Sequence, residues 1–173
     1  MNTVNEISLD FDEIPDGGKF EDLIVSYFED LKNENGQIVD VKVKPSGVGV
    51  DGGRDILVTF KVTDSVTTFD RCWVVQCKFH TSDISTDKIN DINIPTLIHS
   101  YKASGYLLIC RQKPTSKLTD LFERLEDNCK LEYKYLIWSG EQLKRLIIVK
   151  SKKEILQQYF PKYFKYCMDN KLL

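Results

Sequence analysis

Three polar side chains stand where they could act together on two neighbouring apolar segments. Asp55 opens one segment, and Gln76 and Lys78 lie within the next one. Successive side chains of a strand point to opposite faces, so Gln76 and Lys78 share a face. Polar groups in an apolar strand cost free energy unless they have partners. A carboxylate, a carboxamide and an ammonium group would suit a divalent metal, a water and a phosphate.

The two segments predict consecutive strands of one hairpin. Residues 55–62 are rich in β-branched and aromatic side chains, and residues 71–80 follow a polar connection. On the second strand, the face of Gln76 and Lys78 also carries Cys72, Val74 and His80. The opposite face carries Trp73, Val75, Cys77 and Phe79.

The residues before Asp55 match the letters of a dinucleotide-binding loop, G-x-G-x-x-G, between Gly47 and Gly52. Such a loop needs a helix after it, whose N-terminus receives the pyrophosphate. A strand is predicted there instead, so we reject that interpretation. The glycines favour a tight or mobile turn beside a ligand.

A helix is predicted over residues 19–31, with Asp16 as a possible N-cap. Its apolar positions recur at helical spacing, at Phe20, Leu23, Ile24, Tyr27, Phe28 and Leu31. Glu21 lies at the margin of this stripe. It could face a groove beside the core, or it could be a first-turn carboxylate that interacts only with the helix dipole.

The rest of the chain predicts alternating strands and helices. Strands are expected at 37–44, 106–110 and 131–138, and residues 81–93 form a short helix at best. Further helices are expected from Pro95 to near Gly105, over 117–127 with Ser116 as N-cap, after Ser139, and after a Ser151–Glu154 capping box, ending at Pro161 before a basic tail. This order predicts an α/β fold, with a mixed sheet of about five strands and helices on both faces.

Composition narrows the class of protein. Residues 1–70 hold 15 acidic and 6 basic residues, whereas residues 71–173 hold 11 acidic and 18 basic ones, so the second part could face a polyanion. The five cysteines form no Cys-x-x-Cys pair and are interpreted as reduced core residues. No apolar run reaches the length of a membrane helix and no signal peptide is evident, so we expect no membrane partner and a cytoplasmic location.

Asp51-Gly-Gly-Arg-Asp55 followed by Gln76-Cys-Lys78, after a helix that begins Phe20-Glu21, resembles a known family. The pattern is similar to the Mrr-type branch of the PD-(D/E)xK restriction-endonuclease-like nucleases, over about residues 18–148. The branch has glutamine where the broader family has a second acid. The resemblance implies a restriction-endonuclease-like fold and a Mg²⁺ cofactor, which Mn²⁺ can replace.

The resemblance also implies a role for each site residue. Asp55 would be the metal-binding carboxylate, Gln76 would offer its oxygen directly or through water, and the backbone carbonyl of Cys77 would complete the set. Lys78 would orient or deprotonate the attacking water, and Glu21 would support the metal from the helix. Contacts with nucleic acid are expected from a further set of residues: Gly52, Gly53, Arg54, His80 and Lys113.

The expected function is therefore a metal-dependent endonuclease that hydrolyses phosphodiester bonds of DNA, double-stranded above all, in a defence or restriction setting. It would act in a homo-oligomer or as an effector domain of a larger protein. Two alternatives stay open: an inactive module that binds nucleic acid or a partner, and an RNA nuclease. The expected organisation is an N-terminal arm at 1–17, which we interpret as solvated, a nuclease core at 18–148, and a C-terminal helix and tail of the same domain at 149–173.

Overall fold

The computed structural model describes residues 7–32, 36–46 and 54–173. The strands are β1 (Ile38–Pro45), β2 (Ile56–Thr63), β3 (Thr68–Lys78), β4 (Gly105–Cys110) and β5 (Lys134–Trp138). The α-helices are α1 (Gly17–Asp30), α2 (Ile94–Ser100), α3 (Ser116–Asp127), α4 (Gly140–Lys150), α5 (Lys153–Tyr159) and α6 (Pro161–Asp169), with short 3-10 helices η1 (Phe11–Glu13) and η3 (Thr86–Lys88). The predicted order of strands and helices is confirmed.

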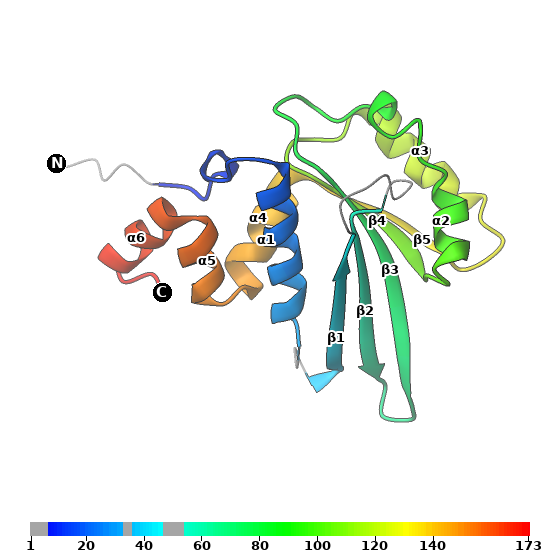
Figure 1. The fold of residues 1–173 in the computed structure, drawn as a ribbon, viewed down its shortest axis with the longest axis horizontal. Helices are drawn as coiled ribbons and strands as arrows, with labels where there is room; N and C mark the ends of the chain where they lie inside the picture. Colours follow the sequence, from blue (N-terminus) through cyan, green and yellow to red (C-terminus); the bar gives the residue numbers. More distant parts are fainter. Residues whose placement is uncertain (1–6, 33–35, 47–53) are drawn as a thin grey trace.

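One mixed sheet of five strands forms the centre of the molecule, in the order β1-β2-β3-β4-β5 (Figure 1). Strands β1, β2 and β3 form an antiparallel meander, whereas β3, β4 and β5 run parallel to one another. Parallel strands need a crossover connection, which α2 supplies between β3 and β4 and α3 supplies between β4 and β5. Because β2 and β3 are antiparallel, the start of β2 and the end of β3 meet at one end of the sheet.

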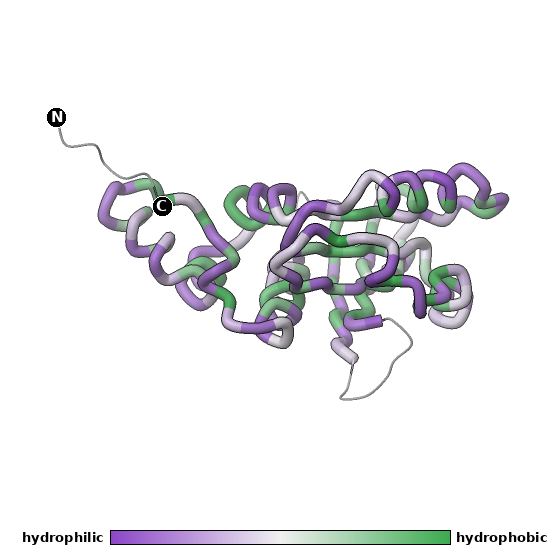
Figure 2. Tube along the Cα trace, turned by 90° about the horizontal axis from the view of Figure 1, so that it is seen from above, coloured by the Kyte–Doolittle hydropathy of each residue, from purple (hydrophilic) through white to green (hydrophobic). Residues whose placement is uncertain are grey.

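Helices cover both faces of this sheet, as predicted. On one face, Val75 and Cys77 of β3 join a core built with α1, α4 and α5. On the other face, Val74 of β3 joins a second core built with α2 and α3. Seen from above in Figure 2, the strands are largely hydrophobic between helices that alternate in hydropathy. We call these the α1 face and the α2 face.

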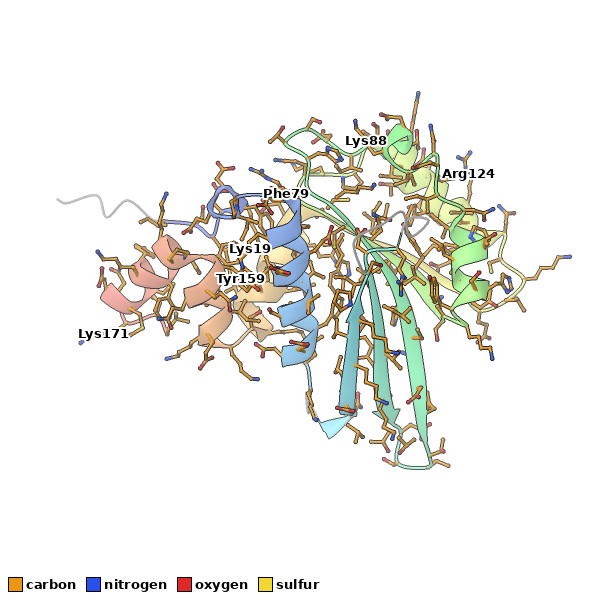
Figure 3. The ribbon with its side chains drawn as sticks, in the orientation of Figure 1. Lys19, Phe79, Lys88, Arg124, Tyr159 and Lys171 are labelled. Atoms are coloured by element: carbon orange, nitrogen blue, oxygen red, sulfur yellow. The ribbon has the colours of Figure 1, made fainter. Side chains whose placement is uncertain are left out.

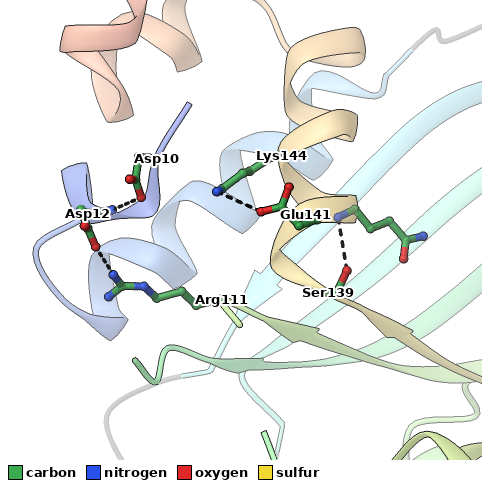
Figure 4. A network of polar contacts seen from close by, with 7 residues as sticks. Asp10, Asp12, Arg111, Ser139, Glu141 and Lys144 are labelled. Carbon is green, nitrogen blue, oxygen red and sulfur yellow. Dashed lines mark hydrogen bonds and ion pairs between the residues drawn. The ribbon is translucent and has the colours of Figure 1, made fainter. Parts of the chain in front are cut away.

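Residues 7–14 are not the solvated arm that the sequence predicted. Leu9, Phe11 and Ile14 are buried in the core of the α1 face. Asp10 caps η1 through the backbone N–H of Asp12, and Asp12 pairs with Arg111 at the end of β4 (Figure 4). The frequent aspartates suggested that the segment is solvated, but the apolar residues between them pack against the core of the α1 face.

The C-terminal helices are joined to the same body by polar contacts with the N-terminal part. The Glu13 carboxylate accepts hydrogen bonds from the first turn of α6, at 2.8 Å from Lys162 N. Asp30, at the end of α1, accepts at 3.0 Å from the backbone N–H of Lys152 at the start of α5. Lys19 lies over the ring of Tyr159, 5.4 Å from its centroid, and both are labelled in Figure 3.

Several predicted helix and strand ends were wrong. Helix α3 begins at Ser116, with Thr115 rather than Ser116 at the N-cap position. The Ser151–Glu154 capping box does not form, because Ser151 closes α4 and Lys152 is the N-cap residue of α5. Pro161 opens α6, so the predicted basic tail is mostly helical. Proline is tolerated there because the first helical turn has unpaired N–H groups.

The bounds of two strands also differ from the prediction. Strand β5 begins at Lys134 and not at 131, and β3 runs from Thr68 to Lys78 and not from 71 to 80. By contrast, Ser139 does cap α4, since its Oγ accepts from Gln142 N at 3.3 Å. Among the described residues, no helix is long and apolar enough to cross a membrane.

Candidate active site

Asp55 lies directly before β2 and faces the end of β3. Its backbone N–H donates to the carbonyl of Val75 at 3.0 Å, which continues the hairpin ladder by one residue. Ser46, just after β1, fixes the same position because its N–H donates to Asp55 O at 2.6 Å and its Oγ donates to Arg54 O at 2.7 Å. The three antiparallel strands thus hold the Asp55 backbone from both sides.

The Asp55 carboxylate is held by two donors from β3. Oδ2 accepts from Gln76 Nε2 at 2.8 Å and from the backbone N–H of Cys77 at 2.6 Å. Oδ1 has no hydrogen-bond partner among the described residues. This pairing confirms that the hairpin brings the predicted carboxylate and carboxamide together.

Gln76 lies on the α2 face of the sheet and is a buried polar residue, with 6% of its surface exposed. Its Nε2 faces Asp55, and its Oε1 is buried without a hydrogen-bond partner in the described part of the chain. In this orientation Gln76 supports Asp55 as a donor. To offer Oε1 to a metal beside Asp55, the carboxamide would have to turn over.

Burial dominates the electrostatics of Asp55. Loss of solvent raises its pKa above the ordinary value, against the opposing effects of the Cys77 N–H, the Lys78 charge and the Gln76 side chain. Lys78 is half-buried on the face of Gln76, opposite Cys110 of β4. Its positive charge is therefore within electrostatic reach of the carboxylate, as the sequence predicted.

Glu21 approaches the same centre from the second turn of α1. Burial raises its pKa first, and the charges of Asp55 and Asp22 raise it further. A contact between two tilted rings fixes this approach: Phe20 lies 5.1 Å from Phe79, centroid to centroid. Figure 3 shows Phe79 beside the beginning of α1, so the residue after Lys78 is tied to the residue before Glu21.

The carboxylates of Glu21 and Asp55 would be more stable beside a divalent cation than without one. Burial penalises the charged form of both carboxyl groups, the charge of Asp55 also penalises that of Glu21, and a cation would offset both effects. Carboxylate oxygens are the ligands that Mg²⁺ prefers, and few are needed because the ion keeps several waters. Within the described residues, no three His, Cys, Asp or Glu side chains gather as a metal-binding set.

Three of the five residues predicted to contact nucleic acid lie in the described part of the chain, each beside a different strand. The guanidinium of Arg54 lies over the ring of Tyr101, the C-cap residue of α2, at 4.7 Å. The hydrogen bond from Ser85 is the main cause that lowers the pKa of Asp87 in η3, and the charges of Lys88 and, least, His80 lower it further. Lys113 is exposed on the loop after β4. Gly52 and Gly53, with the rest of the glycine segment, lie outside the described residues.

Sequence reasoning missed two side chains near this centre. Arg111 is only 12% exposed, pairs with Asp12 and lies 4.6 Å from the Phe79 ring centroid, which braces the segment after Lys78. Tyr106 places a hydroxyl on the α2 face of β4, where every residue is buried. The signal for Tyr106 was a phenol inside an otherwise apolar strand.

Comparison with known proteins identifies solved structures that have a similar fold. A scan against protein-family models and a search of curated proteins each found no match. Among solved structures, the MspJI restriction endonuclease in complex with a 27-mer oligonucleotide is similar, with a TM-score of 0.51 and 13% identity, over 92% of this chain and 40% of that one. The DNA modification-dependent restriction endonuclease AspBHI aligns with a TM-score of 0.49 and 9% identity, over 95% of this chain and 42% of that one.

The chain has a restriction-endonuclease-like α/β fold: a mixed sheet of five strands between helices on both faces. At this identity the similarity to MspJI concerns the fold alone. The chain also spans well under half of the length of that protein.

Proposed function

We propose that this chain is a metal-dependent endonuclease that hydrolyses phosphodiester bonds of DNA, of the Mrr type within the restriction-endonuclease-like fold. The observation that carries the proposal is the convergence of Asp55, Gln76 and Lys78. Asp55 and Gln76 meet in a direct hydrogen bond of 2.8 Å, and the Lys78 charge acts on the same carboxylate. The similar fold of a restriction endonuclease supports the same reaction class.

In the proposed reaction, Asp55 and Glu21 would hold Mg²⁺, and the Cys77 carbonyl would complete the protein ligands. The bound ion would neutralise the phosphodiester and acidify a water. Gln76 keeps the Asp55 carboxylate in place by donating to Oδ2, and Oδ1 would be the oxygen that holds the ion. Lys78, on the same face, would orient the attacking water and stabilise the charge that develops on the phosphate.

The same proposal covers the rest of the chain. Residues 18–148 would form the nuclease core, and residues 149–173 would belong to the same domain, supported by the contacts of Asp30 with Lys152 and of Ser26 with Tyr159. Lys113, His80 and Arg54 are proposed to lie along the DNA. Because the chain spans only 40% of MspJI, we propose that it works in an oligomer or beside further domains.

The test is a cleavage assay with supercoiled plasmid, linear duplex DNA and RNA, each with Mg²⁺, Mn²⁺ or EDTA. We expect DNA products that require the metal. Asp55→Ala and Lys78→Ala should lose cleavage while circular dichroism shows a retained fold, and Asp70→Ala, on an exposed part of β3, is the matched control that should cleave normally.

Three results would contradict the proposal. Undiminished cutting by Asp55→Ala or Lys78→Ala would remove the site. Metal-dependent products from RNA alone would make the chain an RNA nuclease. Binding of DNA without any product in either metal would make it a binding module.

A further inference from the structure

On the α2 face of the sheet, two strand side chains carry buried polar atoms without hydrogen-bond partners among the described residues. One is Gln76 Oε1 and the other is the hydroxyl of Tyr106. A buried oxygen that has given up its hydrogen bonds to water is costly, so such atoms are usually paired with each other or with an ordered water. The two atoms therefore need a common explanation if they are neighbours.

The strand register makes them neighbours. Val74 is opposite Tyr106, and Gln76 is opposite Leu108, so Gln76 and Tyr106 are diagonal partners on adjacent parallel strands. Val74 and Tyr106 both belong to the core of the α2 face, and Gln76 follows Val74 by one full strand repeat on the same side. Diagonal side chains of this length can reach each other, directly or through one water.

Tyr106 is also within electrostatic reach of Asp55. Burial is the main cause that raises the pKa of its hydroxyl, and the charge of Asp55 is the next. The hydroxyl thus keeps its proton at neutral pH and can donate. Gln76 Oε1 is an acceptor that points away from Asp55, because Nε2 of the same group donates to that carboxylate.

We propose that Tyr106 is a positioning residue for the Asp55–Gln76 pair, and that its hydroxyl donates to Gln76 Oε1 through one buried water. The chain of contacts runs from Tyr106 through the water to Oε1, and from Nε2 to Asp55 Oδ2. It fixes which end of the carboxamide faces Asp55 and so keeps the carboxylate oriented. The consequence for metal binding rests on the proposed function, whereas the chain of contacts does not.

The first experiment is a double-mutant cycle on stability, with Tyr106→Phe, Gln76→Met and both together, followed by urea unfolding at pH 7 in EDTA. We expect Tyr106→Phe to lower the unfolding midpoint in the wild-type background and to leave it unchanged when Gln76 is Met. An unchanged or raised midpoint in the wild-type background would overturn the proposal, and so would an equal loss in both backgrounds. If Gln76→Met does not fold, Gln76→Leu takes its place, because leucine also lacks an acceptor at this position, with the same expected loss of coupling.

Tyr135→Phe is the matched control. Tyr135 lies opposite Tyr106 on β5, and its hydroxyl donates to Cys129 Sγ at 3.9 Å. Its effect on the midpoint should be the same whether residue 76 is Gln or Met. Coupling of Tyr135→Phe to Gln76 as large as that of Tyr106→Phe would overturn the specific role of Tyr106.

The second experiment measures Mn²⁺ binding by calorimetry, without nucleic acid. Loss of a group that orients a metal ligand typically weakens metal affinity by about 10- to 100-fold, and we expect a loss in this range for Tyr106→Phe but not for Tyr135→Phe. Equal affinity in wild type and Tyr106→Phe would overturn the positioning role. Failure of the proposed function is distinguishable, because wild type itself would then show no Mn²⁺ binding and no cleavage while the stability cycle still decides the contact.

Discussion

On the α1 face of the sheet, the side chains of β3 enter a core of aliphatic and aromatic residues from α1, α4 and α5. On the α2 face, the same strand carries Val74, then Gln76, then Lys78, beside a buried tyrosine of β4. Both faces are covered by helices, so exposure does not explain the difference. The α1 face contributes packing, and the α2 face gives up part of its packing to hold polar groups around Asp55.

This contrast shows why the polar groups occur at one end of the sheet. The lower part of β3, from Thr68 to Arg71, is exposed and solvates its charges freely. The upper part is buried, so Gln76 must be partnered, and Asp55 is the partner that the hairpin supplies. Burial of a polar residue costs free energy, so a polar residue in such a position indicates a function.

The largest expected effect is a difference between variants of the two faces: one should lose cleavage and the other should lose stability. Lys78→Ala should reduce cleavage by about 10²- to 10⁴-fold, as for loss of a general acid–base or charge-stabilising group, with little change in unfolding free energy. Leu143→Ala, in the α1-face core, should instead lower the unfolding free energy by about 2–5 kcal/mol, with unchanged cleavage per folded molecule. Urea unfolding and initial cleavage rates of the same samples provide the measurements.

If Leu143→Ala does not fold, Ile147→Val tests the same face with an expected loss of about 0.5–1.5 kcal/mol. Equal losses of stability from Lys78→Ala and from the α1-face variant would break the contrast. A large fall in cleavage per folded molecule for the α1-face variant would do the same.

A smaller effect is expected from metal on stability. A cation that binds only the folded chain should stabilise wild type by about 2.7 kcal/mol at 100 times its dissociation constant. Asp55→Asn should abolish this gain because the charged ligand is gone. Asp70→Asn should keep it, because Asp70 is an exposed carboxylate at the far end of β3. Thermal unfolding with Mg²⁺, Mn²⁺ or EDTA measures the gain, and a response in Asp55→Asn equal to that of wild type would place the metal elsewhere.

The smallest expected effect concerns pH. Burial raises the pKa of Asp55 above its ordinary 3.8, so between the unfolded and folded pKa values the folded chain binds more protons and loses stability as pH rises. The cost is fully present at neutral pH in EDTA. Asp55→Asn should therefore be more stable than wild type at pH 7, and its advantage should shrink as pH falls through the raised pKa.

Glu21→Gln should show the same trend, because burial and the charge of Asp55 also raise the Glu21 pKa. Urea midpoints from pH 4 to 8 in EDTA measure both variants. An advantage of Asp55→Asn that grows toward low pH would show that the carboxylate is stabilised in the folded state, contrary to this account.

The sequence by itself determined most of the element order and the core of the site. Alternation along β3 placed Gln76 and Lys78 on one face, and the short connection of the hairpin brought Asp55 beside Gln76. The apolar period of α1 also located its buried face, with Phe20 and Leu23 in the core. These are local properties, because strand and helix periods and short connections depend on neighbours in the chain.

Tertiary structure alone decided how the remaining parts meet. Local patterns suggested Ser116 and Ser151 as caps and a solvated start of the chain, but packing of α3, α5 and residues 7–14 on the body set the actual ends. The approach of Glu21 to Asp55 depends on the Phe20–Phe79 contact between segments far apart in sequence. The burial of Tyr106 beside Gln76 depends on the register of β3 and β4, which a crossover helix separates, and no local pattern encodes that register.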